Sequence, residues 1–165
     1  RAARAVTSEH GESRPPSSGT HRVARGAARR SLHLAAGAHL ARRGAEALVM
    51  PEKMVGLASQ YQDEARGTLG SFSADHLALV VAGIHTTGVT PRRNLAEVYS
   101  HGHRVVQYEK RRLVPGLEAG YERGTVPGLH RAPGGMVGVA ICKDLDFPLT
   151  PAARASAVPA RHRET

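Results

Sequence analysis

The stretch LALVVAGIHTTGVTPRRNLAEVYSHGHRVVQYEK, residues 77–110, contains three of the β-strands that the sequence predicts. Its first six residues, Leu77–Ala82, form a continuous apolar run of the kind found in strands buried on both faces. Asn94–Tyr99 and Arg104–Tyr108 carry β-branched and aromatic residues, and the polar segment His101–His103 separates them. Two such runs around a glycine-containing turn are typical of a β-hairpin. We therefore expect a buried strand followed by a hairpin.

The sequence on either side of this stretch alternates between helical and strand patterns. The expected elements are a helix over Ser31–Arg43, a short buried strand over Ala47–Met50, a helix-compatible stretch over Ser59–Leu69 and a strand over Met136–Ile141. In the first helix Ser31 is a suitable N-cap and Gly44 a stop signal. Leu32, Ala36 and Leu40 fall on one face of that helix. Helices that alternate with buried strands predict a layered α/β domain.

The positive charge of the chain is concentrated at its two ends. The net charge is +9 over 165 residues. Residues 1–43 hold nine arginines against two glutamates, and residues 154–165 hold three arginines against one glutamate. The segment between them has eleven basic and eleven acidic residues. A neutral central domain does not support a nucleic-acid-binding face, which needs a clustered basic surface.

The composition divides the chain into three parts. Residues 1–30 are rich in Arg, Ala, Ser, Gly and Pro, so we expect a disordered basic segment, and we expect residues 150–165 to be a disordered tail of similar character. The domain is expected over residues 31–149. No apolar run approaches the roughly 20 residues that span a bilayer, which favours a cytoplasmic protein. Membrane association would require spans in flanking segments.

Ionisable residues stand directly after apolar strands at three places. Glu52 lies in LVMPEK, Lys110 and Glu118 lie in VVQYEKRRLVPGLE, and Cys142 lies in VGVAICKD. Functional groups of α/β sheets gather where strands end, so these side chains can converge on one site. Cys142 is the single cysteine of the chain, which excludes an intrachain disulfide. It is therefore a packing residue, a metal ligand or a reactive thiol.

The three residue types form a coherent set for nucleophilic catalysis. A thiol attacks a carbonyl or nitrile carbon as the thiolate, which needs a base and a positive environment. Glu52 can accept the thiol proton and return it to a leaving amine. Lys110 can stabilise the thiolate and the oxyanion of the tetrahedral intermediate. The alternation of Val106, Tyr108 and Lys110 places the lysine on the same strand face as the tyrosine.

These strings resemble the motifs of the carbon–nitrogen hydrolase (nitrilase/amidase) superfamily. LVMPEK is similar to its glutamate motif, YEKRRLVPGLE to its lysine motif and GVAICKDLDFP to its cysteine motif, in the family order. The resemblance implies an αββα sandwich with Glu52 as general base, Lys110 as oxyanion stabiliser and Cys142 as nucleophile. Glu118 matches a further glutamate that positions the lysine in many members.

The resemblance covers about Leu32–Phe147, which is less than a full family domain. We therefore expect the N-terminal half of the sandwich, that is, a fragment. LVPGLE and ICKDLDFP are most similar to the apolipoprotein N-acyltransferase-like branch. The expected function is hydrolysis of a non-peptide amide or nitrile through a covalent cysteine intermediate. An N-acyltransferase with the same triad and an inactive truncated remnant are the alternatives.

The expected partners are a small-molecule amide, nitrile or acyl donor, with no nucleic acid and no cofactor. A homo-oligomer is compatible with the sequence. His101 and His103 have a spacing seen in metal sites, but a polar hairpin turn is the favoured interpretation, so no metal is predicted. Asp144 and Asp146 are expected to turn the chain or to bind backbone groups near the thiol.

Overall fold

The computed structural model describes residues 19–76, 79–132 and 135–147. Its elements are α1 (Gly19–Arg42), β1 (Ala47–Val49), β2 (Val55–Ala58), the 3-10 helix η1 (Ser59–Tyr61), α2 (Gln62–His76), β3 (Leu79–Thr87), β4 (Asn94–Ser100), β5 (His103–Glu109), β6 (Gly128–Ala132), β7 (Gly135–Val139) and the 3-10 helix η2 (Cys142–Asp146). Three parts of the prediction lie outside the described residues. They are residues 1–18 of the expected disordered segment, the expected strand start at Leu77 and Ala78, and the expected tail over residues 150–165.

A mixed five-stranded sheet forms the centre of the domain. β3 pairs in parallel with both β1 and β2, and β3, β4 and β5 follow one another in antiparallel order. The predicted β4–β5 hairpin is confirmed, with each boundary within one residue. His101 and Gly102 form its turn with φ values of 50° and 86°. Two left-handed residues are what a type I′ hairpin turn requires, so His101 is a turn residue.

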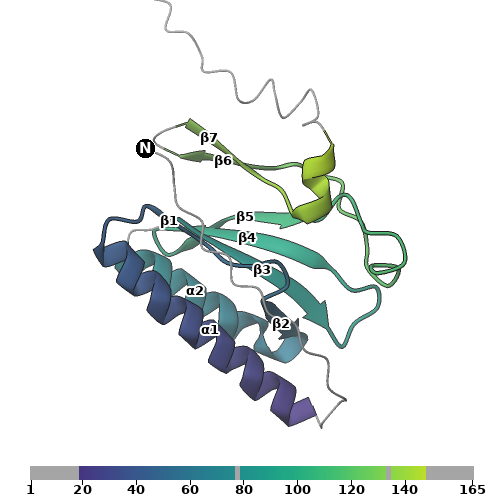
Figure 1. Ribbon diagram of the computed structural model, residues 1–165. Coiled ribbons are helices and arrows are strands. Elements are labelled where there is room, and N and C mark those ends of the chain that lie inside the picture. The colour runs from purple at the N-terminus through teal and green to yellow at the C-terminus, as the bar shows by residue number, and fades with distance from the viewer. Residues whose placement is uncertain (1–18, 77–78, 133–134, 148–165) are drawn as a thin grey trace, which may run out of the picture.

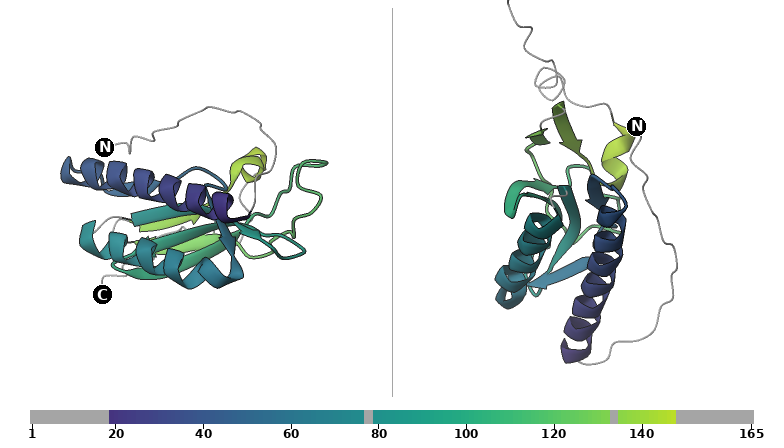
Figure 2. Two further views of the ribbon diagram at one scale, coloured as in Figure 1. Left: turned by 90° about the horizontal axis from the view of Figure 1, so that it is seen from below. Right: turned by 90° about the vertical axis from the view of Figure 1, so that its left-hand side faces the viewer.

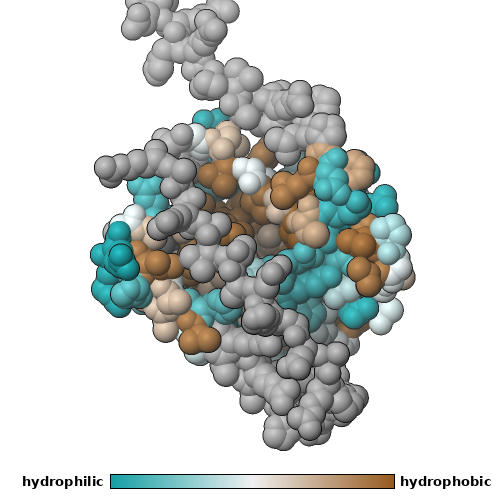
Figure 3. All heavy atoms as spheres, viewed as in Figure 1, coloured by the Kyte–Doolittle hydropathy of each residue, from teal (hydrophilic) through white to brown (hydrophobic). Residues whose placement is uncertain are grey.

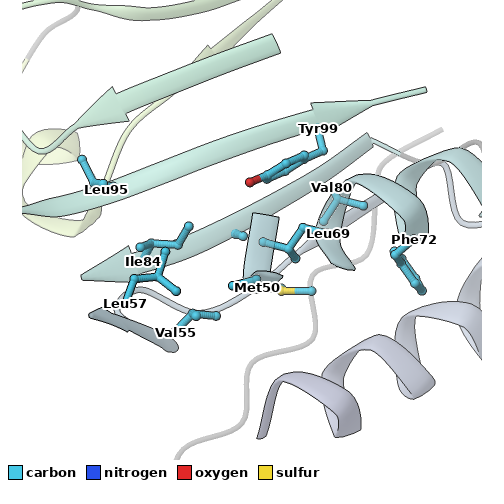
Figure 4. Packing of buried hydrophobic residues seen from close by; sticks show 11 residues of the cluster. Met50, Val55, Leu57, Leu69, Phe72, Val80, Ile84, Leu95 and Tyr99 are labelled. Carbon is cyan, nitrogen blue, oxygen red and sulfur yellow. The ribbon is translucent and has the colours of Figure 1, made fainter. Parts of the chain in front are cut away.

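Both long helices cover the same face of this sheet. α1 and α2 lie side by side beneath the strands in Figure 1, and the view from below in Figure 2 shows the same layer. The core between helices and sheet contains Met50, Val55, Leu57, Leu69, Phe72, Val80, Ile84, Leu95 and Tyr99 (Figure 4). Within the described ranges, neither helix combines the length and apolar content that crossing a membrane requires.

The first helix differs from the prediction in its start and in its buried face. It begins at Gly19, so Ser31 lies inside the helix and residues 19–30 are helical rather than disordered. Its many alanines and arginines are good helix formers, which explains the extension. Leu32 is 70% exposed, and Leu34 and Ala38 pack against the core instead. Gly37 sets this face, because a Cβ there would lie only 2.5 Å from Leu48.

The edge strand β1 is less buried than its apolar sequence suggested. Val49 is 58% exposed, whereas the neighbouring Met50 is buried in the helix-facing core. β1 is at the edge of the sheet, and alternate residues of a strand point to opposite faces. The prediction of a short buried strand over Ala47–Met50 is therefore wrong at Val49.

The face of the sheet opposite the helices carries a second apolar cluster. Ala96, Tyr108 and Ile141 are buried there, with Val81, Val106 and Val139 packed against them. The β6–β7 hairpin lies over this face, and apolar side chains are set back between it and the main sheet (Figures 1 and 3). A helix layer, a main sheet and a second small sheet confirm the predicted α/β class and partial αββα sandwich.

A buried carboxylate fastens α2 to the sheet. Glu97 is 0% exposed and accepts hydrogen bonds from Arg66 Nη2 at 2.8 Å and Arg104 Nη1 at 2.8 Å. Tyr99 Oη donates to its other oxygen at 2.6 Å. The hydrogen bonds satisfy a charge that would otherwise be costly to bury.

Candidate active site

An interruption in the edge strand brings Glu52 over the sheet. β1 pairs with residues 79–81 of β3 and β2 with residues 84–87, so the chain between them leaves the sheet beside Gly83. A Cβ on Gly83 would lie 2.1 Å from Pro51 O and 2.8 Å from Glu52 Cα. Ala82 and Ile84 face the helices, so Gly83 faces the opposite side. The glutamate turn therefore lies against the sheet on the side away from the helices.

Lys110 and Asn94 lie on this same face. Opposed residues of an antiparallel pair share a face, and Ala96 pairs with Tyr108 in the second apolar cluster. Two residues further along each strand, Asn94 and Lys110 stand opposite one another, with Lys110 N donating to Asn94 O at 2.9 Å. Lys110 is 1% exposed and Asn94 is 0% exposed. The β4–β5 hairpin thus places a buried amide beside a buried ammonium.

The loop after β5 turns back to place Glu118 beside them. Its backbone N–H donates to Val114 O at 3.0 Å, and its Oε2 accepts from Val114 N at 2.9 Å. Arg92 N donates to Gly120 O at 3.0 Å, which attaches the loop to the segment before β4. Glu118 is 2% exposed. Local turns, together with backbone hydrogen bonds from the loop to Arg92 and Lys110, therefore hold this carboxylate in place.

The two glutamates meet at the ammonium of Lys110. Lys110 Nζ lies 3.0 Å from Glu52 Oε1 and 3.0 Å from Glu118 Oε2. Asn94 Nδ2 donates to Glu52 Oε1 at 2.6 Å and to Glu118 Oε1 at 2.9 Å. Both carboxylates accept hydrogen bonds, so the nitrogen of the Asn94 side-chain amide, and not its oxygen, faces them. Three of the four predicted site residues thus form one hydrogen-bonded cluster.

The cluster favours the charged forms of Lys110 and Glu118. Burial disfavours the Lys110 ammonium and is the largest influence on it, but hydrogen bonds to Glu118 and Glu52 outweigh it and raise the pKa. Burial likewise disfavours the Glu118 carboxylate, yet hydrogen bonds from Lys53, Val114 N, Lys110 and Asn94 lower its pKa from 4.5 to about 2. Lys110 is therefore a cation and Glu118 an anion at neutral pH.

Lys53 is a fourth charged member that the sequence did not indicate. Its ammonium forms an ion pair with Glu118 Oε1 and lies 3.8 Å from Glu52 Oε1. It also stands 4.7 Å from the centre of the Tyr121 ring. Its φ of 55° is unusual for a residue with a Cβ and belongs to the turn that carries Glu52. A sequence cannot show this contact, because it joins two loops.

Cys142 lies at the start of η2, which Asp144 attaches to β5. Asp144 accepts hydrogen bonds from Tyr108 Oη at 2.7 Å, Arg112 N at 2.7 Å and Ile141 N at 3.0 Å. Tyr108 and Arg112 flank Lys110 in sequence, so η2 lies at the strand end that carries the lysine. Figure 1 shows η2 beside the loop after β5. The backbone-binding role that we expected for Asp144 is confirmed.

The thiol itself is exposed, so the packing alternative for Cys142 does not hold. Its φ is 46°, a left-handed conformation at the junction of β7 and η2. Among the described residues, no hydrogen bond or ion pair joins the thiol to Glu52, Lys110 or Glu118, and no group of three or more His, Cys, Asp or Glu side chains is placed to hold a metal ion. The site consists of a charged cluster with an exposed thiol at the same end of β5.

Comparisons with known proteins place this geometry in context. No family model matches the sequence, and no curated protein matches it. Solved structures of an amidase from Nesterenkonia sp. AN1 do match. The enzyme after tag removal is 26% identical, with a TM-score of 0.63 over 74% of this chain and 53% of that chain. A glutamate-to-glutamine variant with the acetamide moiety of fluoroacetamide on its active-site cysteine is 25% identical, with a TM-score of 0.65 over 79% of this chain and 54% of that chain.

A third structure is a cysteine-to-alanine variant of the same amidase in complex with butyramide. It is 25% identical, with a TM-score of 0.62 over 74% of this chain and 52% of that chain. The amidase is described as a member of the nitrilase superfamily. The chain spans about half the length of these solved structures. The likeness matches the predicted nitrilase-type fold and supports the predicted resemblance to the carbon–nitrogen hydrolase superfamily.

Proposed function

We propose that this chain carries the site of a thiol-dependent carbon–nitrogen hydrolase that acts on a small non-peptide amide or nitrile. Cys142 is the nucleophile, Glu52 the general base, Lys110 the cation that stabilises the oxyanion, and Glu118 the residue that positions Lys110. The observation that carries this proposal is the Lys110 ammonium, buried and 3.0 Å from each of the two glutamates at the strand end to which η2 is attached.

In the acylation half-reaction, Glu52 takes the proton of the Cys142 thiol as the sulfur attacks the amide carbon. The C–S bond forms and the carbonyl π-electrons move to oxygen, where Lys110 stabilises the negative charge. When the tetrahedral intermediate collapses, the C–N bond breaks and Glu52 gives its proton to the departing amine. The products of this half are a thioester on Cys142 and ammonia or an amine.

In the second half-reaction the acyl group leaves the enzyme. Glu52 takes a proton from water, which attacks the thioester carbon, and the C–S bond breaks to release a carboxylic acid and restore the thiol. An amine that replaced water would instead give a new amide, which is the N-acyltransferase chemistry that the sequence motifs resemble. The proposed acceptor is water, because the solved structures that match are amidases.

Ammonia release from acetamide and butyramide tests the proposal in the full chain. Cys142→Ala, Glu52→Gln and Lys110→Met should each lower the rate by about three orders of magnitude or more, since residues that act as a unit fail together. Glu122→Gln is the matched control for Glu52→Gln, because Glu122 is an exposed carboxylate paired only with Arg93 among the described side chains. Hydrolysis that persists in Cys142→Ala would overturn the proposal.

Adding hydroxylamine during turnover separates the two acceptors. A hydrolase forms mainly carboxylic acid until hydroxylamine is concentrated, whereas an acyltransferase needs an amine for any turnover. Absence of both products, together with a Cys142 thiol that reacts like a free cysteine, would support the inactive alternative.

A further inference from the structure

The charge of the proposed site does not balance with its predicted members alone. Glu52 and Glu118 bring two negative charges to one positive charge on Lys110. A thiolate and an oxyanion both form more readily beside net positive than net negative charge. With only these residues, the cluster would oppose the charge that the reaction creates on Cys142.

Lys53 supplies the missing positive charge from the opposite side of Glu118. Lys110 contacts Oε2 of that carboxylate, whereas Lys53 contacts Oε1. Lys53 Nζ is also 3.8 Å from Glu52 Oε1, so it faces both carboxylates. With Lys53 included, the cluster holds two carboxylates and two ammonium groups.

The other charged and titratable groups around Lys53 do not replace it. Arg92 stacks on the Tyr121 ring that Lys53 also contacts, with its guanidinium carbon 4.5 Å from the ring centre. His85 is hydrogen-bonded to the Lys53 backbone, and its burial lowers its pKa, so it is neutral at pH 7. Neither group forms an ion pair with Glu118 within the described part of the chain. Among the described residues, Lys53 is therefore the second cation, beside Lys110, that forms an ion pair with Glu118.

The backbone at Lys53 is held in a conformation that favours glycine. A φ of 55° is unfavourable for a residue with a Cβ, and such outliers persist where the surroundings hold them. Glycine would be the residue that fits this turn most easily. A lysine here instead directs an ammonium group into the cluster, although its side chain remains 31% exposed.

We propose that Lys53 is a positioning residue that neutralises Glu118, so that Lys110 remains available to Glu52 and to the negative charge that develops on Cys142 and the substrate. This inference rests on the proposed function. In this role Lys53 acts through its charge and does not need to touch the substrate. A variant that keeps the charge should therefore keep the effect, and a variant that keeps only the hydrogen bond should not.

The pH dependence of Cys142 alkylation by iodoacetamide tests the inference in the full chain. Cys142 is the single cysteine, so the alkylation rate reports its thiolate directly and needs no turnover. Lys53→Gln keeps a donor to Glu118 but loses the charge, and should raise the apparent thiol pKa by about one unit, a tenfold lower rate at a given pH below it. Lys53→Arg should keep the wild-type profile.

Two further variants separate charge from structure. Arg131→Met removes one positive charge from an exposed position of β6 and should leave the profile unchanged. Lys53→Gln combined with Glu118→Gln leaves one carboxylate and one ammonium, and should return the thiol pKa most of the way to the wild-type value. Circular dichroism confirms that each variant is folded, and Lys53→Met, which removes the same charge, provides the test if Lys53→Gln does not fold.

An unchanged profile in Lys53→Gln, or no recovery in the double variant, would overturn the role of Lys53. That failure differs from a failure of the proposed function. A wild-type Cys142 with the pKa and reactivity of a free thiol, or full amide hydrolysis in Cys142→Ala, would remove the nucleophile itself. If the wild-type thiol is activated and Lys53→Gln leaves its alkylation profile unchanged, only the positioning role of Lys53 is overturned.

Discussion

Replacing Gly83 with alanine tests how Glu52 is placed. The new Cβ would lie 2.1 Å from Pro51 O, whereas Cβ contacts below 3.0 Å are essentially never seen. The close atoms are backbone, so the turn that carries Glu52 must move by about 1 Å, and overpacking of this kind costs about 1–3 kcal/mol of unfolding free energy. A misplacement of about 1 Å at a catalytic group can lower the rate by about 100-fold.

Amide hydrolysis and urea unfolding of the full chain measure the two effects. Gly67→Ala is the matched control, because Gly67 is an exposed position of α2 with nothing within 4 Å of an added Cβ. It should keep wild-type activity and gain about 0.5–1 kcal/mol from the better helix propensity of alanine. Wild-type activity and stability in Gly83→Ala would show that the Glu52 turn does not rest on this glycine.

Three other changes have expected outcomes. Glu97→Ala should lose about 2–3 kcal/mol in urea unfolding, because the partly exposed Arg66 and Arg104 lose a buried acceptor, and a loss below about 0.5 kcal/mol would contradict this role. Glu118 has its pKa lowered to about 2, so its stabilisation is complete above pH 4.5 and is lost as the pH falls towards 2. The stability difference between wild type and Glu118→Gln should therefore shrink by about 3 kcal/mol over that range, and a constant difference would refute the ion cluster. Asp144→Ala should release η2 and cost about 1–3 kcal/mol, seen as faster hydrogen exchange over residues 141–147, where unchanged exchange would be contrary evidence.

Local sequence signals were sufficient for the central hairpin but not for the elements around it. The turn at His101–Gly102 and the strands that flank it follow from composition and alternation alone. β2 was missed because Val55–Ala58 is four residues long, contains a glycine and follows a proline turn, so its strand character comes from pairing with β3. The buried face of α1 depends on the close approach at Gly37, which no helical periodicity records.

The position of the candidate residues at strand ends was visible in the sequence, but their contacts were not. Val105 is an extra residue in β5, and the resulting register shift places Asn94, rather than Arg93, opposite Lys110. A regular two-residue hairpin would have given the other pairing. Lys53 reaches Glu118 through a left-handed backbone and a loop of another segment, so its part in the cluster is purely tertiary. The catalytic roles of Glu52, Lys110, Glu118 and Cys142 stay predictions.

Intact-mass spectrometry of the full chain incubated with fluoroacetamide tests the central proposal most directly. A carbon–fluorine bond reacts poorly with ordinary thiols, so an adduct requires an activated one. We expect one acetamide group on Cys142 in the wild-type protein, and a much slower reaction in Lys110→Met. No adduct, or equal adduct rates in the wild type and Lys110→Met, would contradict an activated Cys142 beside Lys110.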